Sequence, residues 1–204
     1  MKESRVLVWD VGGVLLSNGW DREEREETAK RFAIDLTELD QRVERSAPKY
    51  EEGRSSLDQF LDETVFYVPR PFSRAEFTTH LFSLSRANQP VLEFARELAR
   101  AGRYRMVALN NEGAEFNQHR IDAFGLREVV SAFFTSCYTG IRKPDPSAFQ
   151  LVTNVLQVSP SECVFVDDRA VNVAAAQQAG WSSIRFENAA QLRTSLAQEG
   201  FSPD

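Results

Sequence analysis

The chain has 204 residues and a formal net charge of −6, with 42% hydrophobic and 26% charged residues. This balance is that of an ordinary globular protein, and the length suffices for one core-forming domain with a small inserted lobe. The negative charge excludes the broad basic surface with which many proteins bind nucleic acid or anionic membranes.

The first predicted element is a buried β-strand over residues 5–9, a short apolar run rich in β-branched and aromatic residues. It ends at Asp10, and Gly12 and Gly13 follow almost at once. Glycines after a charged strand end indicate a sharp turn in which the backbone, unobstructed by a side chain, can come close to a ligand.

Charged, helical sequence follows over residues 18–86. Three stretches in it have the spacing of a capping box: Thr37 to Asp40, Ser56 to Gln59 and Ser73 to Glu76. A capping box marks the start of a helix, because its two side chains satisfy free backbone N–H groups of the first turn. We therefore predict several helices inserted after the first strand, forming a helical cap domain over residues 18–86.

The rest of the chain alternates between strand and helix patterns. Further apolar runs predict strands over residues 105–109, 132–136, 163–166 and 182–186, with helical stretches between them. This alternation is typical of an α/β fold with a doubly wound parallel sheet. Residues 1–17 and 87–204 are predicted to form this Rossmann-like core domain.

Three of the predicted strands end in polar residues: Asp10, Asn110-Asn111 and Asp167-Asp168. Ligands of open parallel sheets bind beyond the carboxyl ends of the strands, so Asp10, Asp167 and Asp168 are predicted to converge if their strands are neighbours. Carboxylates that lie so close repel each other unless a cation lies among them, and hard oxygen ligands suit Mg²⁺. Lys143, on a loop before a helix start, is predicted to reach the same cluster or a phosphate oxygen.

These segments resemble the four motifs of the haloacid dehalogenase superfamily, in the same order and with a helical cap in the same place. The last two motifs carry the most specific resemblance: RKPDP at residues 142–146 and VFVDDRAVNVAAAQQAG at residues 164–180. Within the superfamily the chain resembles small capped sugar-phosphate phosphatases and the N-terminal phosphatase-like domain of soluble epoxide hydrolases.

The resemblance implies a role for each motif residue. Asp10 would be the nucleophile and form an aspartyl phosphate, and Lys143 would stabilise both this nucleophile and the transferring phosphoryl group. Asn111, and Asn110 with backbone amides, would hold the phosphoryl oxygens. The implied Mg²⁺ ligands are Asp10, the main-chain carbonyl of Gly12, Asp167 and Asp168.

Two positions depart from the family pattern. Phosphatases of the family usually carry an aspartate at the position of Gly12, where it protonates the leaving group, and serine or threonine at the position of Asn110. Losing a general acid typically costs 10²–10⁴-fold in rate. The sequence therefore leaves open which group acts as the acid.

The leading hypothesis is a Mg²⁺-dependent phosphatase that acts on a small phosphorylated metabolite, with sugar phosphates among the candidates. A hydrolytic dehalogenase of the same superfamily is the first alternative, because halide leaves without a proton and needs no acid at Gly12. It also needs no metal, however, and Asp167 and Asp168 would then repel Asp10. The second alternative, a catalytically silent binding protein, explains the departures but not the joint presence of the acidic residues and Lys143.

The cysteine content and the hydropathy predict a cytoplasmic protein. Cys137 and Cys163 are isolated from each other and from both histidines, which fits a reducing compartment. No apolar run has the length of a signal peptide core or of a membrane span. We expect no nucleic-acid or membrane partner, and the sequence predicts neither the substrate nor the oligomeric state.

Overall fold

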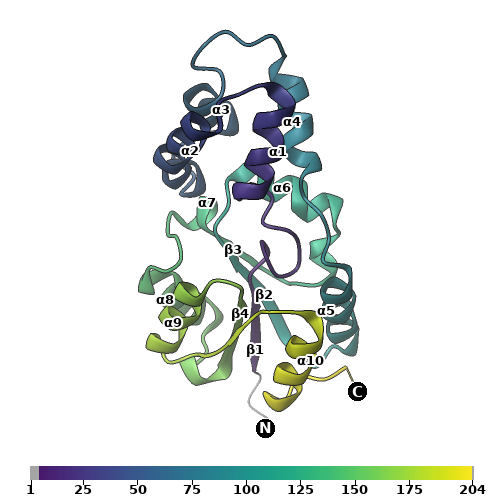
Figure 1. Cartoon of the computed structure of the whole chain (residues 1–204). Helices are drawn as coiled ribbons and strands as arrows, with labels where there is room; N and C mark the ends of the chain where they lie inside the picture. Colours follow the sequence, from purple (N-terminus) through teal and green to yellow (C-terminus); the bar gives the residue numbers. More distant parts are fainter. Residues whose placement is uncertain (1–4, 204) are drawn as a thin grey trace.

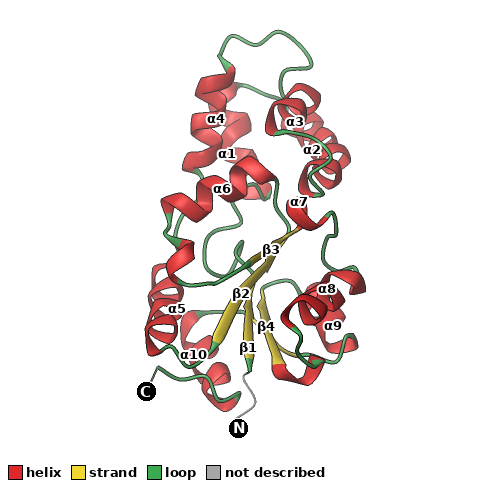
Figure 2. Cartoon of the chain, turned by 180° about the vertical axis from the view of Figure 1, so that it is seen from behind, coloured by secondary structure: helices red, strands yellow, loops and turns green. Residues whose placement is uncertain are grey.

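A computed structural model of the chain describes residues 5–203, which contain a five-stranded parallel sheet in the order β3-β2-β1-β4-β5. Figure 2 shows β1 to β4 of this sheet with helices on either side. The strands are β1 (Val6–Trp9), β2 (Arg105–Asn110), β3 (Phe133–Thr135), β4 (Cys163–Asp167) and β5 (Ser182–Arg185). All neighbouring strands pair in parallel. The five predicted strands and the doubly wound α/β class are confirmed.

Helices cover both faces of the sheet, which explains why its central strands are continuously apolar. One face packs against α5 (Gln89–Ala101) and α10 (Ala189–Gln198), and the other against α8 (Pro146–Leu156) and α9 (Ala170–Gln178). Successive strand side chains point to opposite faces, so Leu7 and Trp9 enter the first layer while Val6 and Val8 enter the second.

Shorter elements complete the core. They are the helices α6 (Ala114–Ala123) and α7 (Ser136–Thr139) and two 3₁₀ turns, Leu126–Glu128 and Pro160–Glu162. The start of α6 follows β2, and α7 follows β3 directly. Both helices therefore begin near the carboxyl end of the sheet, where ligands of such sheets bind.

Four helices lie together beyond the carboxyl ends of the strands (Figure 1). They are α1 (Arg22–Phe32), α2 (Leu36–Glu51), α3 (Leu57–Thr64) and α4 (Arg74–Ser83), and we call them the cap helices. They share a hydrophobic cluster of their own, in which Leu61, Val65 and Phe77 are fully buried. This arrangement follows from the predicted insertion, and the exact boundaries at residues 18 and 86 stay a prediction.

Two of the three predicted capping boxes are confirmed, at Ser56 with Gln59 and at Ser73 with Glu76. The third was wrong. Helix α2 begins one residue before Thr37, because Asp35 caps it by accepting a hydrogen bond from the main-chain N–H of Glu38 at 2.7 Å. Aspartate is among the strongest N-cap residues, and Asp35 lies two residues before Thr37, the predicted N-cap.

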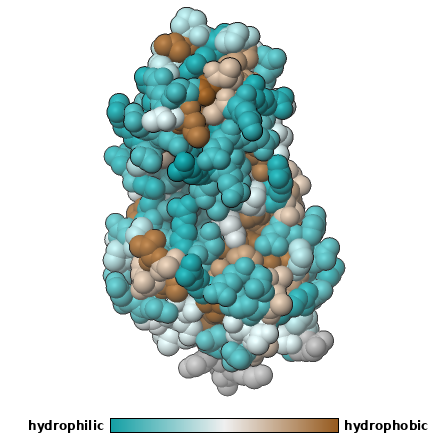
Figure 3. All heavy atoms as spheres, viewed as in Figure 1, coloured by the Kyte–Doolittle hydropathy of each residue, from teal (hydrophilic) through white to brown (hydrophobic). Residues whose placement is uncertain are grey.

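The outer surface seen in Figure 3 is mostly polar, unlike the packed faces of the sheet and helices. Its hydrophobic patches there are small and separate. Exposed large hydrophobic side chains include Val155 and Val171 on the outer helices. Among residues 5–203, no helix is both long enough and apolar enough to cross a membrane.

The cap helices meet the core where Tyr50 of α2 packs on Gly113, the residue that precedes α6. A Cβ atom added to Gly113 would lie 2.0 Å from the Tyr50 ring, far inside van der Waals contact. The Tyr50 ring also stacks on Phe60 of α3, with ring centroids 4.9 Å apart. Gly113 has φ −73° and ψ 154°, which any residue adopts, so its glycine is needed for space rather than for backbone conformation.

We expect Gly113→Ala to destabilise the protein by about 1–3 kcal/mol, the usual cost of overpacking a tight contact. The added methyl group must displace the Tyr50 ring and with it the end of α2. Urea unfolding of the variant and the native protein measures the difference.

The double variant Gly113→Ala/Tyr50→Ala is the control, because removal of the ring makes room for the methyl group. In the Tyr50→Ala background, adding Gly113→Ala should cost little, since neighbouring residues that share a contact are non-additive. An equal cost in both backgrounds would contradict the steric explanation.

Candidate active site

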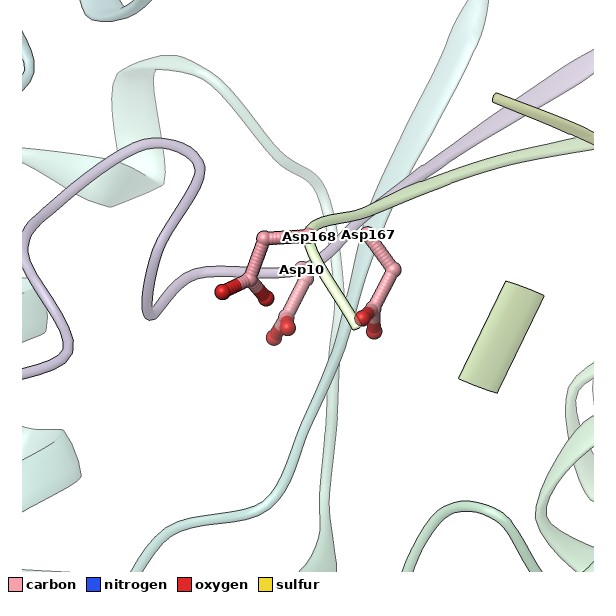
Figure 4. A group of neighbouring side chains, drawn as sticks. All are labelled: Asp10, Asp167 and Asp168. Atoms are coloured by element: carbon pink, nitrogen blue, oxygen red, sulfur yellow. The ribbon is translucent and has the colours of Figure 1, made fainter. Parts of the chain in front are cut away.

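The site is built at the carboxyl ends of β1 and β4, which are neighbours in the sheet. The pairing of Trp9 with Val166 brings Asp10 and Asp167 side by side, and the Asp10 N–H donates to the Val166 carbonyl at 2.9 Å. One carboxylate oxygen from each of Asp10, Asp167 and Asp168 lies within 4.8 Å of the others. Their side chains project to the same side of the strand ends (Figure 4), so the predicted convergence is confirmed.

Lys143 brings a positive charge into this cluster, as its loop position predicted. Its Nζ atom lies 3.0 Å from Asp10 and 2.6 Å from Asp167, and its side chain is almost completely buried. Asn111 fixes the loop by two hydrogen bonds: its Nδ2 donates to the Lys143 carbonyl and its Oδ1 accepts from the Lys143 N–H, both at 2.8 Å. Asn111 thereby orients the lysine toward the carboxylates.

Burial dominates the electrostatics of the cluster. It raises the pKa of Asp10 well above the ordinary value, and the Asp167 carboxylate adds to this while Lys143 opposes it. Burial and Asp167 also raise the pKa of Asp168. For Lys143, burial alone would lower the pKa, but the two carboxylates raise it above the ordinary value. Two of the three carboxylates thus share one lysine, and Asp168 adds a further negative charge beside them.

The donor set fits a hard divalent cation such as Mg²⁺. It offers oxygen atoms only, and Asp168 Oδ1 is buried without a hydrogen-bond partner. Gly13 makes the approach of Asp168 feasible: a Cβ there would lie 2.4 Å from Asp168 Oδ2, and its φ of +77° favours glycine. At Gly12 an added Cβ would meet only ordinary contacts, from 3.4 Å outward, and the Gly12 carbonyl as a metal ligand stays a prediction.

The structure uses the amide groups of both asparagines within the protein. Asn110 Nδ2 donates to Asn117 at 3.1 Å, and its Oδ1 accepts from the Thr135 hydroxyl at 2.8 Å. Asn111 holds the Lys143 loop in the same way. Side-chain binding of phosphoryl oxygens by these residues therefore competes with internal bonds, and the substrate-binding roles of Asn110 and Asn111 stay a prediction.

A cavity of about 360 Å³ lies between the cap helices and the strand ends. Asn111 and Arg169, which adjoin the acidic cluster, line its core side, and aromatic residues line its other parts: Trp20, Tyr50, Phe60 and Phe116. Its arginines are paired with carboxylates: Arg25 with Asp40 at 2.5 Å, Arg142 with Glu51 at 2.7 Å and Arg169 with Asp21 at 3.2 Å. The last two pairs join the cap helices to the core.

One further buried ion pair borders the cavity, and the sequence analysis missed it. Arg120 of α6 donates from Nη1 to Glu112 Oε1 at 2.9 Å, with 1% and 8% of the two side chains exposed. Burial raises the pKa of Glu112 to about 7, against the lowering effect of Arg120. The available signal was a glutamate directly after the polar end of the second strand, although nothing in the local pattern indicated its arginine partner.

Comparison with known proteins agrees with this geometry. The family model described as haloacid dehalogenase-like hydrolase matches residues 5–180. The chain is 40% identical over 79 residues to flavin mononucleotide hydrolase 1 of Arabidopsis thaliana, a match that covers 39% of this chain and 32% of that protein. It is 26% identical to phosphatase MT3486 of Mycobacterium tuberculosis, over 95% of this chain and 92% of that protein.

The fold recurs in solved structures. A haloacid dehalogenase family enzyme from Bacteroides thetaiotaomicron, in complex with magnesium and inorganic phosphate, superposes with a TM-score of 0.77 at 21% identity. The match covers 90% of this chain and 94% of that one. Among the first curated relatives that it matches, the chain spans between 24% and 36% of their length.

We expect Lys143→Met to lower the free energy of unfolding by about 3–5 kcal/mol in the presence of a chelator, because it leaves buried carboxylates without their fixed cation. Urea unfolding at neutral pH measures this loss.

Lys49→Met is the matched control, since Lys49 forms an ion pair with Glu63 at 2.9 Å in which both side chains are exposed. Exposed pairs are worth about 0–1 kcal/mol, so this variant should lose little. A similar loss of unfolding free energy in the two variants would show that Lys143 does not stabilise the carboxylates of the cluster.

Proposed function

The chain belongs to the haloacid dehalogenase-like hydrolase family, and from this premise we propose that it is a Mg²⁺-dependent phosphatase of a small phosphorylated metabolite. One observation carries the proposal: Asp10, Asp167 and Asp168 converge, two of them on the same lysine, next to residues that line a cavity beneath the cap helices. This excess of buried carboxylates is costly unless a cation joins it, and a cation with a positive side chain suits a phosphoryl group.

The residues fall into the roles that this reaction needs. An oxygen of Asp10 forms a bond to phosphorus as the bond to the leaving oxygen breaks, and water later releases phosphate from the aspartyl phosphate. Lys143, already 3.0 Å from Asp10, holds the nucleophile and offsets charge on the phosphoryl oxygens. Mg²⁺ would be held by Asp10, Asp167, Asp168 and the Gly12 carbonyl, and when bound it supplies further charge neutralisation.

The relatives support the same reaction class. One is named a flavin mononucleotide hydrolase and another a phosphatase, and the similar structure from Bacteroides thetaiotaomicron holds magnesium and inorganic phosphate. The metal-independent dehalogenase alternative lacks such support from the site, since it would leave Asp167 and Asp168 beside Asp10 without a function and without a cation.

The cavity favours a small substrate whose remainder carries no further charge. A volume of about 360 Å³ is at the lower end of ligand pockets. The arginines of its lining already bind carboxylates, so a second anionic group on the substrate would have to displace an existing ion pair. A neutral, hydroxyl-rich remainder such as that of a sugar phosphate avoids this competition.

Hydrolysis of p-nitrophenyl phosphate should stop when a chelator is added and resume when Mg²⁺ is restored, because the carboxylates need a cation before they can accept an anionic substrate. Release of nitrophenolate, followed by its absorbance, is the measurement. Full activity in excess chelator would overturn the phosphatase proposal, and halide release from a short haloacid under those conditions would favour the dehalogenase.

Asp10→Asn should reduce this hydrolysis to background while the protein stays folded. The amide keeps the shape of the side chain, removes the nucleophile and adds no buried charge. Steady-state rates and the melting temperature are compared with those of Asp145→Asn, which alters an exposed N-cap to another good N-cap residue. Persistent turnover by purified Asp10→Asn would place the nucleophile elsewhere.

A further inference from the structure

We propose that Glu112 is the general acid that protonates the leaving-group oxygen and the base that then activates water, a role that rests on the phosphatase function proposed above. A phosphate ester of an ordinary alcohol needs such a group, because an alkoxide is a poor leaving group without a proton. The position of Glu112, its hydrogen bonds and its surroundings support the proposal independently of one another.

Glu112 lies at the substrate cavity, next in the chain to the asparagine that holds Lys143. It follows Asn111, whose side chain binds the main chain of Lys143, and its own N–H donates to the Ser136 hydroxyl at 3.0 Å. Its side chain lines the cavity together with Asn111 and Gly113. A carboxyl group here borders the space where the part of the substrate beyond phosphorus must lie.

Only one oxygen of this carboxyl group is engaged. Arg120 Nη1 donates to Oε1 at 2.9 Å, while Oε2 is buried and has no hydrogen-bond partner. Arg120 itself is fixed, since its Nε donates to the Ser85 hydroxyl at 3.1 Å and its Nη2 to the Ser17 carbonyl. An unpaired buried oxygen costs free energy, and this cost is removed when the carboxyl group turns Oε2 toward the cavity and shares a proton with a ligand oxygen.

The glycine at position 12 leaves room for this arrangement. A Cβ on Gly12 would lie 3.5 Å from Arg120 Nη1, the nitrogen that holds Glu112. A side chain at position 12 would therefore point toward the Glu112–Arg120 pair. Glu112 reaches the same region from the end of β2, which explains how the site can have a carboxyl group there although position 12 has none.

The surroundings of Glu112 keep both of its protonation states accessible near neutral pH. Burial raises its pKa to about 7; Arg120 and Lys143 lower it, and Glu51 of α2 raises it. The Tyr50 hydroxyl and the Cys137 thiol, from α2 and α7, also face it, and both stay protonated because burial raises their own pKa values. A group that must both donate and accept a proton works best when its pKa lies near the working pH, and a pKa of about 7 meets this condition at neutral pH.

Glu112 gives up one proton in the first half of the reaction and regains one in the second. As Asp10 bonds to phosphorus, the bond to the leaving oxygen breaks and its electron pair takes the proton from Glu112 Oε2, giving an alcohol and a carboxylate. Water then attacks the aspartyl phosphate, and Glu112 takes one proton from it. The phosphorus–Asp10 bond breaks with its electrons returning to Asp10, and inorganic phosphate leaves with Glu112 protonated again.

The test is Glu112→Gln, assayed with Mg²⁺ on ethyl phosphate and on p-nitrophenyl phosphate. Glutamine keeps an oxygen for Arg120 but cannot donate an acidic proton. We expect kcat/KM for ethyl phosphate to fall by about 10²-fold or more, the scale of losing a general acid. The kcat/KM for p-nitrophenyl phosphate should change little, because it reports only the steps up to the departure of nitrophenolate, which leaves without a proton; kcat falls for both substrates, because both need Glu112 to activate water.

Glu115→Gln is the matched control. It makes the same change three residues away, at a side chain that accepts from the Leu57 N–H and does not line the cavity, and glutamine can still accept that bond. Both substrates should react at native rates in this variant.

The native protein gives a second readout that needs no variant. An acid acts in its protonated form, so kcat/KM for ethyl phosphate should be full below pH 7 and fall as the pH rises through about 7. This fall should be absent with p-nitrophenyl phosphate and with Glu112→Gln. Equal losses of kcat/KM on both substrates, or none on either, would overturn the role of Glu112 while leaving the phosphatase intact. Absence of any Mg²⁺-dependent hydrolysis by the native protein would overturn both.

Discussion

The ion pairs of Lys143 with Asp10 and Asp167 are the interaction on which the rest of the structure depends. One lysine lies among three carboxylates at the ends of two buried strands, at 3.0 Å and 2.6 Å from two of them. Parallel pairing of β1 with β4 sets the carboxylates side by side, and Asn111 holds the lysine in place from the end of β2. The order of the strands thus brings three carboxylates together at one edge of the sheet. Because Lys143 balances only part of their negative charge, the site is stabilised by binding a cation or a proton.

The cap helices turn this charged edge into a partly covered cavity. Tyr50 packs where Gly113 leaves no side chain, and the Glu51–Arg142 and Asp21–Arg169 pairs join the two parts on either side of the cavity. The deeper a charged group lies beneath this cover, the less water screens it and the stronger its electrostatic interactions become. The same ion pairs occupy the arginines of the cavity, so the residues that fasten the cap also limit the charge that a substrate can carry.

Much of this arrangement follows from local sequence, and the parts that do not depend on contacts between distant segments. Short apolar runs bounded by polar residues predict the five strands, and the strand-end rule predicts that Asp10 and Asp167 meet. The start of α2 was predicted wrongly because two cap signals overlap and Asp35 prevails over Thr37. The engagement of Asn110 with Asn117 and Thr135, and the pairing of Glu112 with Arg120, arise from the packing of α6 and β3 on β2. No spacing in the sequence indicates either contact.

Burial raises the pKa of Asp10 and that of Glu112 alike, yet the reaction needs a charged nucleophile and a neutral acid. The neighbours resolve this conflict. Asp10 shares its lysine with Asp167 in a cluster of oxygen ligands, where a bound cation favours the carboxylate. Glu112 has one oxygen on Arg120 and the other unpaired, with Glu51 near enough to disfavour a second negative charge. Two carboxyl groups on adjacent strands can therefore take opposite protonation states in one site, which is the condition for nucleophilic and acid catalysis to act on the same bond.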